Sequence, residues 1–191
     1  MPGISISNIE RELRAEGLNY GLPFTRVTLG GPVEPEPVED VVQMILESTP
    51  KRGWVLLVGE LPDDPLNLGI GTLVRGLSQL QRFVEVETSG LYRDPSWLPA
   101  CDRWTVECQP KMGFNLGALR VTDCIRLTLP SIADLDKVES FLLVLKQYSC
   151  TKYVLLPRST GGKDFDDNWR EFWSSSFNLV SKFERTRLFV V

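Results

Sequence analysis

A continuous apolar stretch, residues 54–58 with the sequence WVLLV, constrains the fold of this chain more than any other feature. A run of apolar side chains without alternation is typical of a strand buried on both faces, as in a parallel sheet covered by helices. Residues 38–48 before it have apolar side chains at helical spacing, and so does the segment that contains Leu73, Leu77 and Leu80 after it. The pattern predicts strand and helix in alternation.

The rest of the chain continues this alternation. Strands are expected at residues 24–29, 54–58, 83–87, 103–108, 124–129 and 153–156. Helices are expected at residues 38–48, around Leu73, at 132–148 with Ser131 as its cap, and at 164–174. The segment around Ile9 and Leu13 fits a helix or a strand. This order predicts an α/β fold with a largely parallel sheet, built as one domain over residues 1–191, and six such units suggest a partial, open barrel.

The link between the first strand and the first long helix is short. The strand ends at Gly30-Gly31, and only residues 32–37, PVEPEP, separate it from the helix. Proline lacks the backbone donor that a strand ladder needs, so we expect a stiff, solvated connection.

Polar motifs follow several predicted strands. Gly59 and Glu60 follow the second strand within VGELP, and residues 87–90, ETSG, follow the third. Lys111 follows the fourth within QPK, and Glu16-Gly17 forms a glycine turn with Gly21 before the first. Ligands of α/β folds bind at the C-terminal ends of strands, where glycine lets a ligand approach the backbone.

Taken in order, these segments resemble the radical S-adenosylmethionine (SAM) enzyme family of 7-carboxy-7-deazaguanine synthases, which act in queuosine biosynthesis. VGELP resembles G-G-E-P, ETSG resembles E-T-(N/S)-G, QPK resembles S-P-K, and the Glu16-Gly17 turn resembles Q-G-E-G. Two later segments, DCIR at 123–126 and YVLLP at 153–157, resemble D-E-I-K and Y-L-Q-P. The resemblance covers nearly the whole chain and implies a partial (β/α)6 open barrel of radical SAM type that forms a homodimer.

The resemblance also implies a site. The residues it places in a SAM-like cofactor pocket are Gly59, Glu60, Glu87, Thr88, Ser89 and Lys111. The residues it places beside the substrate are Glu16 and Gly17. The ligand that it implies is SAM or a 7-deazaguanine-type base.

The sequence departs from the family at the centre of its chemistry. In the family, the first strand leads into a CxxxCxxC-type loop that holds a four-iron four-sulfur cluster. Here residues 30–37 contain no cysteine, and none precedes Cys101. Since the protein must supply three thiolates to such a cluster, neither the cluster nor radical SAM chemistry is expected. Val58 replaces the first glycine of G-G-E-P and narrows the approach for SAM.

Composition excludes several other classes. The chain has no histidine, which rules out Ser–His and Cys–His catalysis. Its four cysteines include no CxxC pair, so we expect reduced, mostly buried thiols and no metal site. The net charge of −4 argues against nucleic acid as a partner. The sequence suggests neither a signal peptide nor a membrane span, and we expect a cytoplasmic protein.

These observations favour a pseudoenzyme: a non-catalytic or repurposed homologue that acts as a binding or partner subunit, linked to 7-deazaguanine or queuosine metabolism. One alternative is an enzyme of another type that uses Glu60, Glu87 and Lys111 for acid–base or metal-assisted chemistry on a small molecule. Another is a pure protein-interaction module, with Val58 and Leu61 filling the mouth of the barrel.

Overall fold

The computed structural model describes residues 3–13, 21–60, 68–89, 95–108, 119–129, 131–156 and 165–190. The chain divides into two compact units, Met1–Val106 and Glu107–Val191. Both units combine helices with mostly parallel strands, which confirms the predicted α/β class. The expectation of one domain stays a prediction.

The first unit contains a sheet whose strands are arranged in the order in which they occur along the chain. The paired strands, in spatial order, are β2 (Ile6–Leu13), β3 (Pro23–Leu29), β5 (Trp54–Gly59), β6 (Phe83–Thr88) and β7 (Arg103–Cys108), the last belonging to this unit up to Val106. β2 is antiparallel to β3, whereas the successive pairs from β3 to β7 are parallel. The ambiguous segment around Ile9 is therefore an edge strand.

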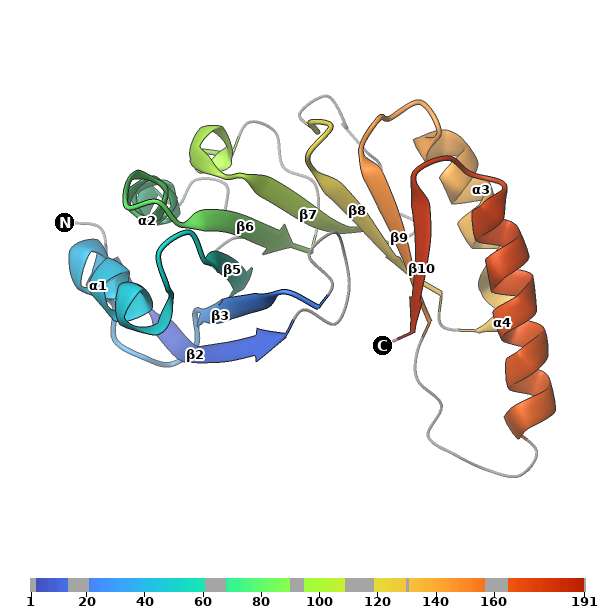
Figure 1. Ribbon diagram of the computed structural model, residues 1–191, viewed down its shortest axis with the longest axis horizontal. Helices are drawn as coiled ribbons and strands as arrows, with labels where there is room; N and C mark the ends of the chain where they lie inside the picture. The colour runs from blue at the N-terminus through green and yellow to red at the C-terminus, as the bar shows by residue number, and fades with distance from the viewer. Residues whose placement is uncertain are drawn as a thin grey trace. The chain divides into compact units, whose positions relative to one another are not determined.

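Two helices pack side by side in this unit, α1 (Val38–Ser48) and α2 (Leu68–Gln79) (Figure 1). α1 has the predicted bounds, because Pro37 precedes it with extended backbone and Thr49 ends it. It buries Val41 and Ile45, which lie on one helical face. Leu80 lies outside α2 and is 47% exposed, so its place on the predicted helix face was wrong.

The two faces of this sheet differ in chemistry. Thr25 donates a hydrogen bond from its hydroxyl to the carbonyl of Ser48 at the end of α1, which identifies its side of β3 as the helix-covered one. Alternation then places fully buried Val27 on that face and Phe24 on the other. Phe24, Leu56 and Val58 form a buried apolar cluster on the second face. In the parallel register of β5 and β6, Glu85 lies opposite Leu56, so a buried charged residue also lies on this second face.

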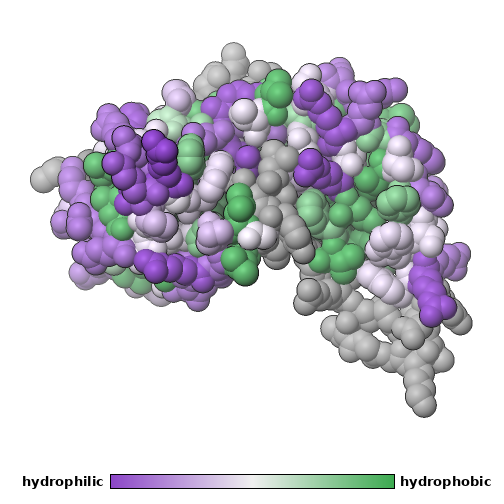
Figure 2. Space-filling view, viewed as in Figure 1, coloured by the Kyte–Doolittle hydropathy of each residue, from purple (hydrophilic) through white to green (hydrophobic). Residues whose placement is uncertain are grey.

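The second unit repeats the parallel arrangement. Its strands are β8 (Cys124–Thr128), β9 (Thr151–Leu156) and β10 (Thr186–Val190), and β9 pairs in parallel with both others. Two helices, α3 (Leu135–Leu145) and α4 (Phe165–Ser181), contact each other in this unit (Figure 1). On the face seen in Figure 2, apolar side chains gather over β9 and β10. Tyr153 of β9 and Phe189 of β10 make an edge-to-face ring contact, with centroids 5.6 Å apart.

The predicted helix bounds needed correction in this unit. The segment predicted as one helix at 132–148 begins with a 3-10 turn, Ile132–Asp134, and its α-helix ends at Leu145. Ser131 does not cap the backbone, because its hydroxyl bonds the Asp134 carboxylate at 2.7 Å. α4 continues to Ser181, beyond the predicted end at 174.

Candidate functional site

The strand ends picked out by the sequence lie together at the C-terminal edge of the first unit's sheet. β5 pairs in parallel with β6, and Leu57 is opposite Val86 in that register. The segments that follow these two residues, with Gly59-Glu60 on one strand and Glu87-Thr88-Ser89 on the next, are therefore neighbours. β3 ends on the other side of β5 with Leu29 opposite Gly59.

Close backbone packing explains the glycine at position 59. Its φ angle is +116°, a region that residues with a side chain rarely adopt. A Cβ atom there would lie 2.1 Å from the carbonyl oxygen of Leu29 on the neighbouring strand. The packing of β5 against β3 thus requires glycine, whether or not a ligand approaches.

Glu60 lies against the end of the first parallel strand. A Cβ atom on Gly30 would be 3.3 Å from the Glu60 Cβ and 3.4 Å from a carboxylate oxygen. Gly30 and Gly31 have φ angles of +91° and +92°, so both take a left-handed conformation suited to glycine. Glu60 is exposed and packs its side chain over this glycine turn.

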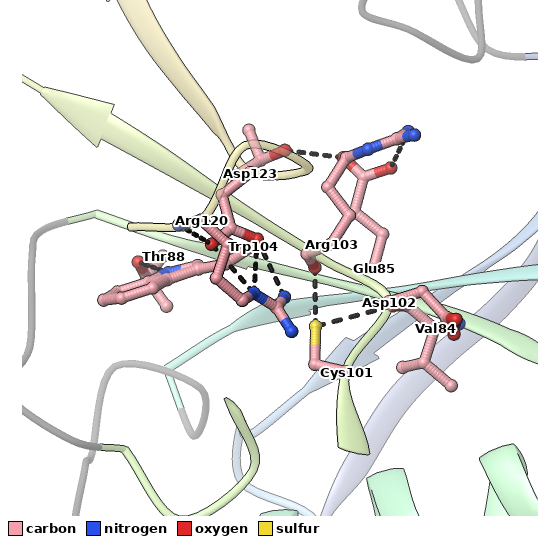
Figure 3. Close-up of polar contacts among 10 residues, drawn as sticks. Val84, Glu85, Thr88, Cys101, Asp102, Arg103, Trp104, Arg120 and Asp123 are labelled. Carbon is pink, nitrogen blue, oxygen red and sulfur yellow. Dashed lines mark hydrogen bonds and ion pairs between the residues drawn. The ribbon is translucent and has the colours of Figure 1, made fainter. Parts of the chain in front are cut away.

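The Thr88 side chain is buried. It is 2% exposed, and its hydroxyl oxygen accepts a hydrogen bond of 2.8 Å from the indole nitrogen of Trp104 (Figure 3). Trp97 meets Trp104 edge to face at 5.2 Å. The hydroxyl predicted to contact a ligand therefore holds a buried tryptophan in place, while Glu87 is half-buried and Ser89 exposed.

Three predicted site residues, Lys111, Glu16 and Gly17, lie outside the described residues, as does Leu61. Val58 is 6% exposed, within the apolar cluster of Phe24 and Leu56.

The connection at residues 30–37 is tied to the start of the chain. β4 (Glu36–Pro37) pairs antiparallel with β1 (Gly3–Ile4). The amide of Gly30 donates to the carbonyl of Ser5 at 2.9 Å, and the Ser5 hydroxyl donates to the carbonyl of Val33 at 2.7 Å. Hydrogen bonds at several positions thus join the connection between β3 and α1 to the N-terminal segment.

The four cysteines are reduced and buried, as predicted. Burial raises the pKa of Cys108 to about 12, with Cys150 and Glu107 adding to the effect, and burial also raises the pKa of Cys150. Both thiols therefore stay protonated at neutral pH, which disfavours nucleophilic or metal-binding roles. Over the described ranges, no three histidine, cysteine or acidic side chains gather closely enough to hold a metal ion.

A buried charged group that the sequence analysis missed lies on the second face of the first unit's sheet. Glu85 is 4% exposed, accepts a hydrogen bond of 2.7 Å from the Thr105 hydroxyl and pairs with Arg103 at 3.5 Å (Figure 3). The Arg103 guanidinium also lies 4.8 Å from the centre of the Trp54 ring. A glutamate at an inward position between two buried valines is the signal that could have located this group.

In the second unit, the segment that resembles D-E-I-K is held by its own turn. Asp123 is fully buried and pairs with Arg120 at 2.8 Å, and it also accepts the Arg120 amide hydrogen bond at 2.7 Å (Figure 3). Arg126 pairs with Glu107 at 3.0 Å. These charged side chains therefore have partners inside the unit.

Each unit also has a cleft at the N-terminal ends of its strands, whereas the cofactor pocket is predicted at the C-terminal ends. One, of about 480 Å³ in the first unit, is lined by Phe24 and Trp54 and by the cations Arg11, Lys51 and Arg52. The Arg11 guanidinium donates to the carbonyls of Glu47 and Ser48 at the end of α1, where a cation favourably meets the helix dipole. The other, of about 370 Å³, lies in the second unit and is mainly polar.

No protein-family model matches this chain, and a search of curated proteins found no significant match. None of the helices within the described ranges has the length and apolar character needed to cross a membrane.

Proposed function

We propose that this protein is a non-catalytic relative of the radical SAM enzyme 7-carboxy-7-deazaguanine synthase, and that it acts as a partner subunit linked to 7-deazaguanine metabolism. The observation that carries the proposal is the connection between β3 and α1. Where the family has its cluster loop, residues 30–37 contain no cysteine and bond to the N-terminal segment through Gly30, Ser5 and Val33.

The strand order supports the fold that this proposal requires. From β3 to β7 in the first unit, and from β8 to β10 in the second, each parallel strand pairs with the next one along the chain. A partial open barrel of radical SAM type is wound in this sequential way, whereas doubly wound sheets reverse their strand order near the middle. We therefore favour the open barrel.

The pocket residues favour a partner subunit over a cofactor-binding one. The Thr88 hydroxyl bonds Trp104, and the glycine at 59 is required by Leu29. Val58 packs in the buried cluster beside them. Two of the residues that the resemblance assigns to the SAM pocket, Gly59 and Thr88, are thus used within the fold, and we propose that the protein associates with a second copy or an active homologue.

A thermal-shift titration with SAM and with a 7-deazaguanine base tests the proposal that the protein is a partner subunit. A ligand that binds only the folded state should add about 2.7 kcal/mol of stability at 100 times its dissociation constant. We expect no shift with either ligand. A saturable shift with SAM that is lost in Glu60→Gln and Glu87→Gln, but kept in the control Glu10→Gln on β2, would overturn the partner-subunit proposal.

A further inference from the structure

A cation-rich cleft lies where β9 and β10 begin in the second unit. Its volume is about 370 Å³, and four of its lining residues are basic: Lys146, Lys152, Lys182 and Arg185. Glu184 is the acidic residue among its lining groups. The chain as a whole carries a net charge of −4, so this concentration of positive charge is a local feature of the fold.

Two of these cations are held in place by neutral partners. The Lys152 ammonium donates a hydrogen bond to the carbonyl of Tyr148, and the Arg185 guanidinium donates to the carbonyl of Ser149. The Lys152 amide also donates to the Arg185 carbonyl at 2.9 Å, which fixes the two residues beside each other. Because a carbonyl carries no net charge, neither cation is neutralised by these bonds.

Burial makes the positive charge of Lys152 costly without a counterion, whereas Arg185 is exposed at the cleft. Lys152 is 4% exposed, and desolvation together with the nearby Arg185 lowers its pKa, although Cys150 acts in the opposite direction. Lys182 is different, because it pairs with the Glu139 carboxylate at 2.8 Å. Within the part of the chain that the structure describes, no carboxylate pairs with Lys152 or Arg185.

We propose that this cleft binds the phosphate group of a small phosphorylated metabolite. A dianion would neutralise Lys152 and Arg185 together, and a guanidinium matches the oxygens of a phosphate group through paired hydrogen bonds. Exposed Lys146 adds a third positive charge at the cleft. The small volume suits a metabolite, and the acidic chain lacks the wide basic surface that nucleic acids require.

The test is calorimetric titration of the full chain with inorganic phosphate, followed by competition with glycerol 3-phosphate. We expect saturable phosphate binding that weakens by at least about tenfold in Lys152→Met, since a charge-assisted hydrogen bond is lost while the aliphatic stem is kept. Arg185→Asn should weaken binding similarly, because asparagine tolerates the φ angle of +55° at this position. Glycerol 3-phosphate should displace phosphate from the wild-type protein.

The matched control is Lys137→Met, which removes an exposed lysine of the same unit that pairs with Asp134 outside the cleft. Its phosphate affinity should equal that of the wild type. Absence of phosphate binding, or equal affinities in the wild type and Lys152→Met, would overturn the site. Phosphate binding that glycerol 3-phosphate cannot compete with would overturn the assignment to a phosphorylated metabolite. The site is independent of the proposed relation to radical SAM enzymes, and neither result affects the other.

Discussion

The C-terminal strand ends of the first unit and the N-terminal strand ends of the second unit use polar groups in opposite ways. In the first, the Thr88 hydroxyl is bonded to Trp104, and Gly59 accommodates the Leu29 carbonyl. In the second, Lys152 and Arg185 donate hydrogen bonds to carbonyls, which carry no net charge to neutralise them. Gly59 and Thr88, which the sequence marks as ligand contacts, are thus used within the fold, whereas Lys152 and Arg185, which it does not mark, remain able to bind an anion.

This difference shows why residue type alone is a weak guide to a binding site. A glycine or threonine at a strand end is compatible with a ligand, yet each can equally satisfy its own neighbours. What decides availability is the partner of each polar group, which depends on contacts between distant segments. Substitutions in the first region should therefore lower the free energy of unfolding. In the second region, Lys152 should make the free energy of unfolding depend on pH.

The largest effect is expected for Gly59→Ala. The new methyl group would meet the Leu29 carbonyl at 2.1 Å, and alanine would be strained at a φ angle of +116°. Strain and overpacking together should lower the free energy of unfolding by about 3 kcal/mol, measured by urea denaturation.

Gly21→Ala is the matched control for this substitution. Gly21 has a φ angle of +77° with nothing within 4 Å of an added Cβ, so only the conformational cost of about 1 kcal/mol should appear. Equal losses at the two positions would show that close packing against β3 is not what requires glycine at 59.

A smaller loss is expected for Thr88→Val. Valine keeps the shape of the side chain but removes the acceptor of the buried Trp104 indole, which should cost about 2 kcal/mol. Thr88→Ser retains the hydroxyl and should recover most of the hydrogen-bond energy. Denaturation followed by tryptophan fluorescence would measure both variants, and a valine variant as stable as the wild type would contradict a structural role for this hydroxyl.

The smallest effect is a pH dependence at Lys152. Its folded-state pKa is lowered by desolvation, so the unfolded chain binds more protons just below pH 10.5, the ordinary lysine value. The stability cost of burying the charge is complete below the folded-state pKa and disappears as pH rises above 10.5.

Relative to Lys152→Met, the wild-type protein should therefore gain stability as pH rises through this interval. The measurement is the free energy of unfolding of both proteins, without phosphate, from neutral to strongly alkaline pH. A difference between the two that stays constant, or moves in favour of the variant, would show that the lysine is not desolvated in the folded state.

Local sequence patterns predicted the elements of the fold well. The WVLLV run is a strand, and the bounds of α1 follow from Pro37 and Thr49. Patterns were ambiguous for β2, an edge strand with half-buried and exposed side chains. The start of α3 differed because the Ser131 hydroxyl bonds the Asp134 side chain in place of a backbone amide.

The site was less accessible to sequence reasoning, for a physical reason. The partner of Thr88 lies on the next strand, and Lys152 lies beside Arg185 only because β9 pairs with β10. Such contacts join residues far apart in the chain, and the spacing of residues along the sequence does not predict them. The missing cysteines at 30–37, in contrast, are a direct property of the sequence.

The most direct test of the central claim is anaerobic reconstitution of the full chain with iron and sulfide, followed by electron paramagnetic resonance of the reduced protein and measurement of SAM cleavage. A protein without the cluster loop should give no four-iron four-sulfur signal and should leave SAM intact. A cluster signal accompanied by reductive cleavage of SAM would contradict the proposal that this protein is a non-catalytic relative of such enzymes.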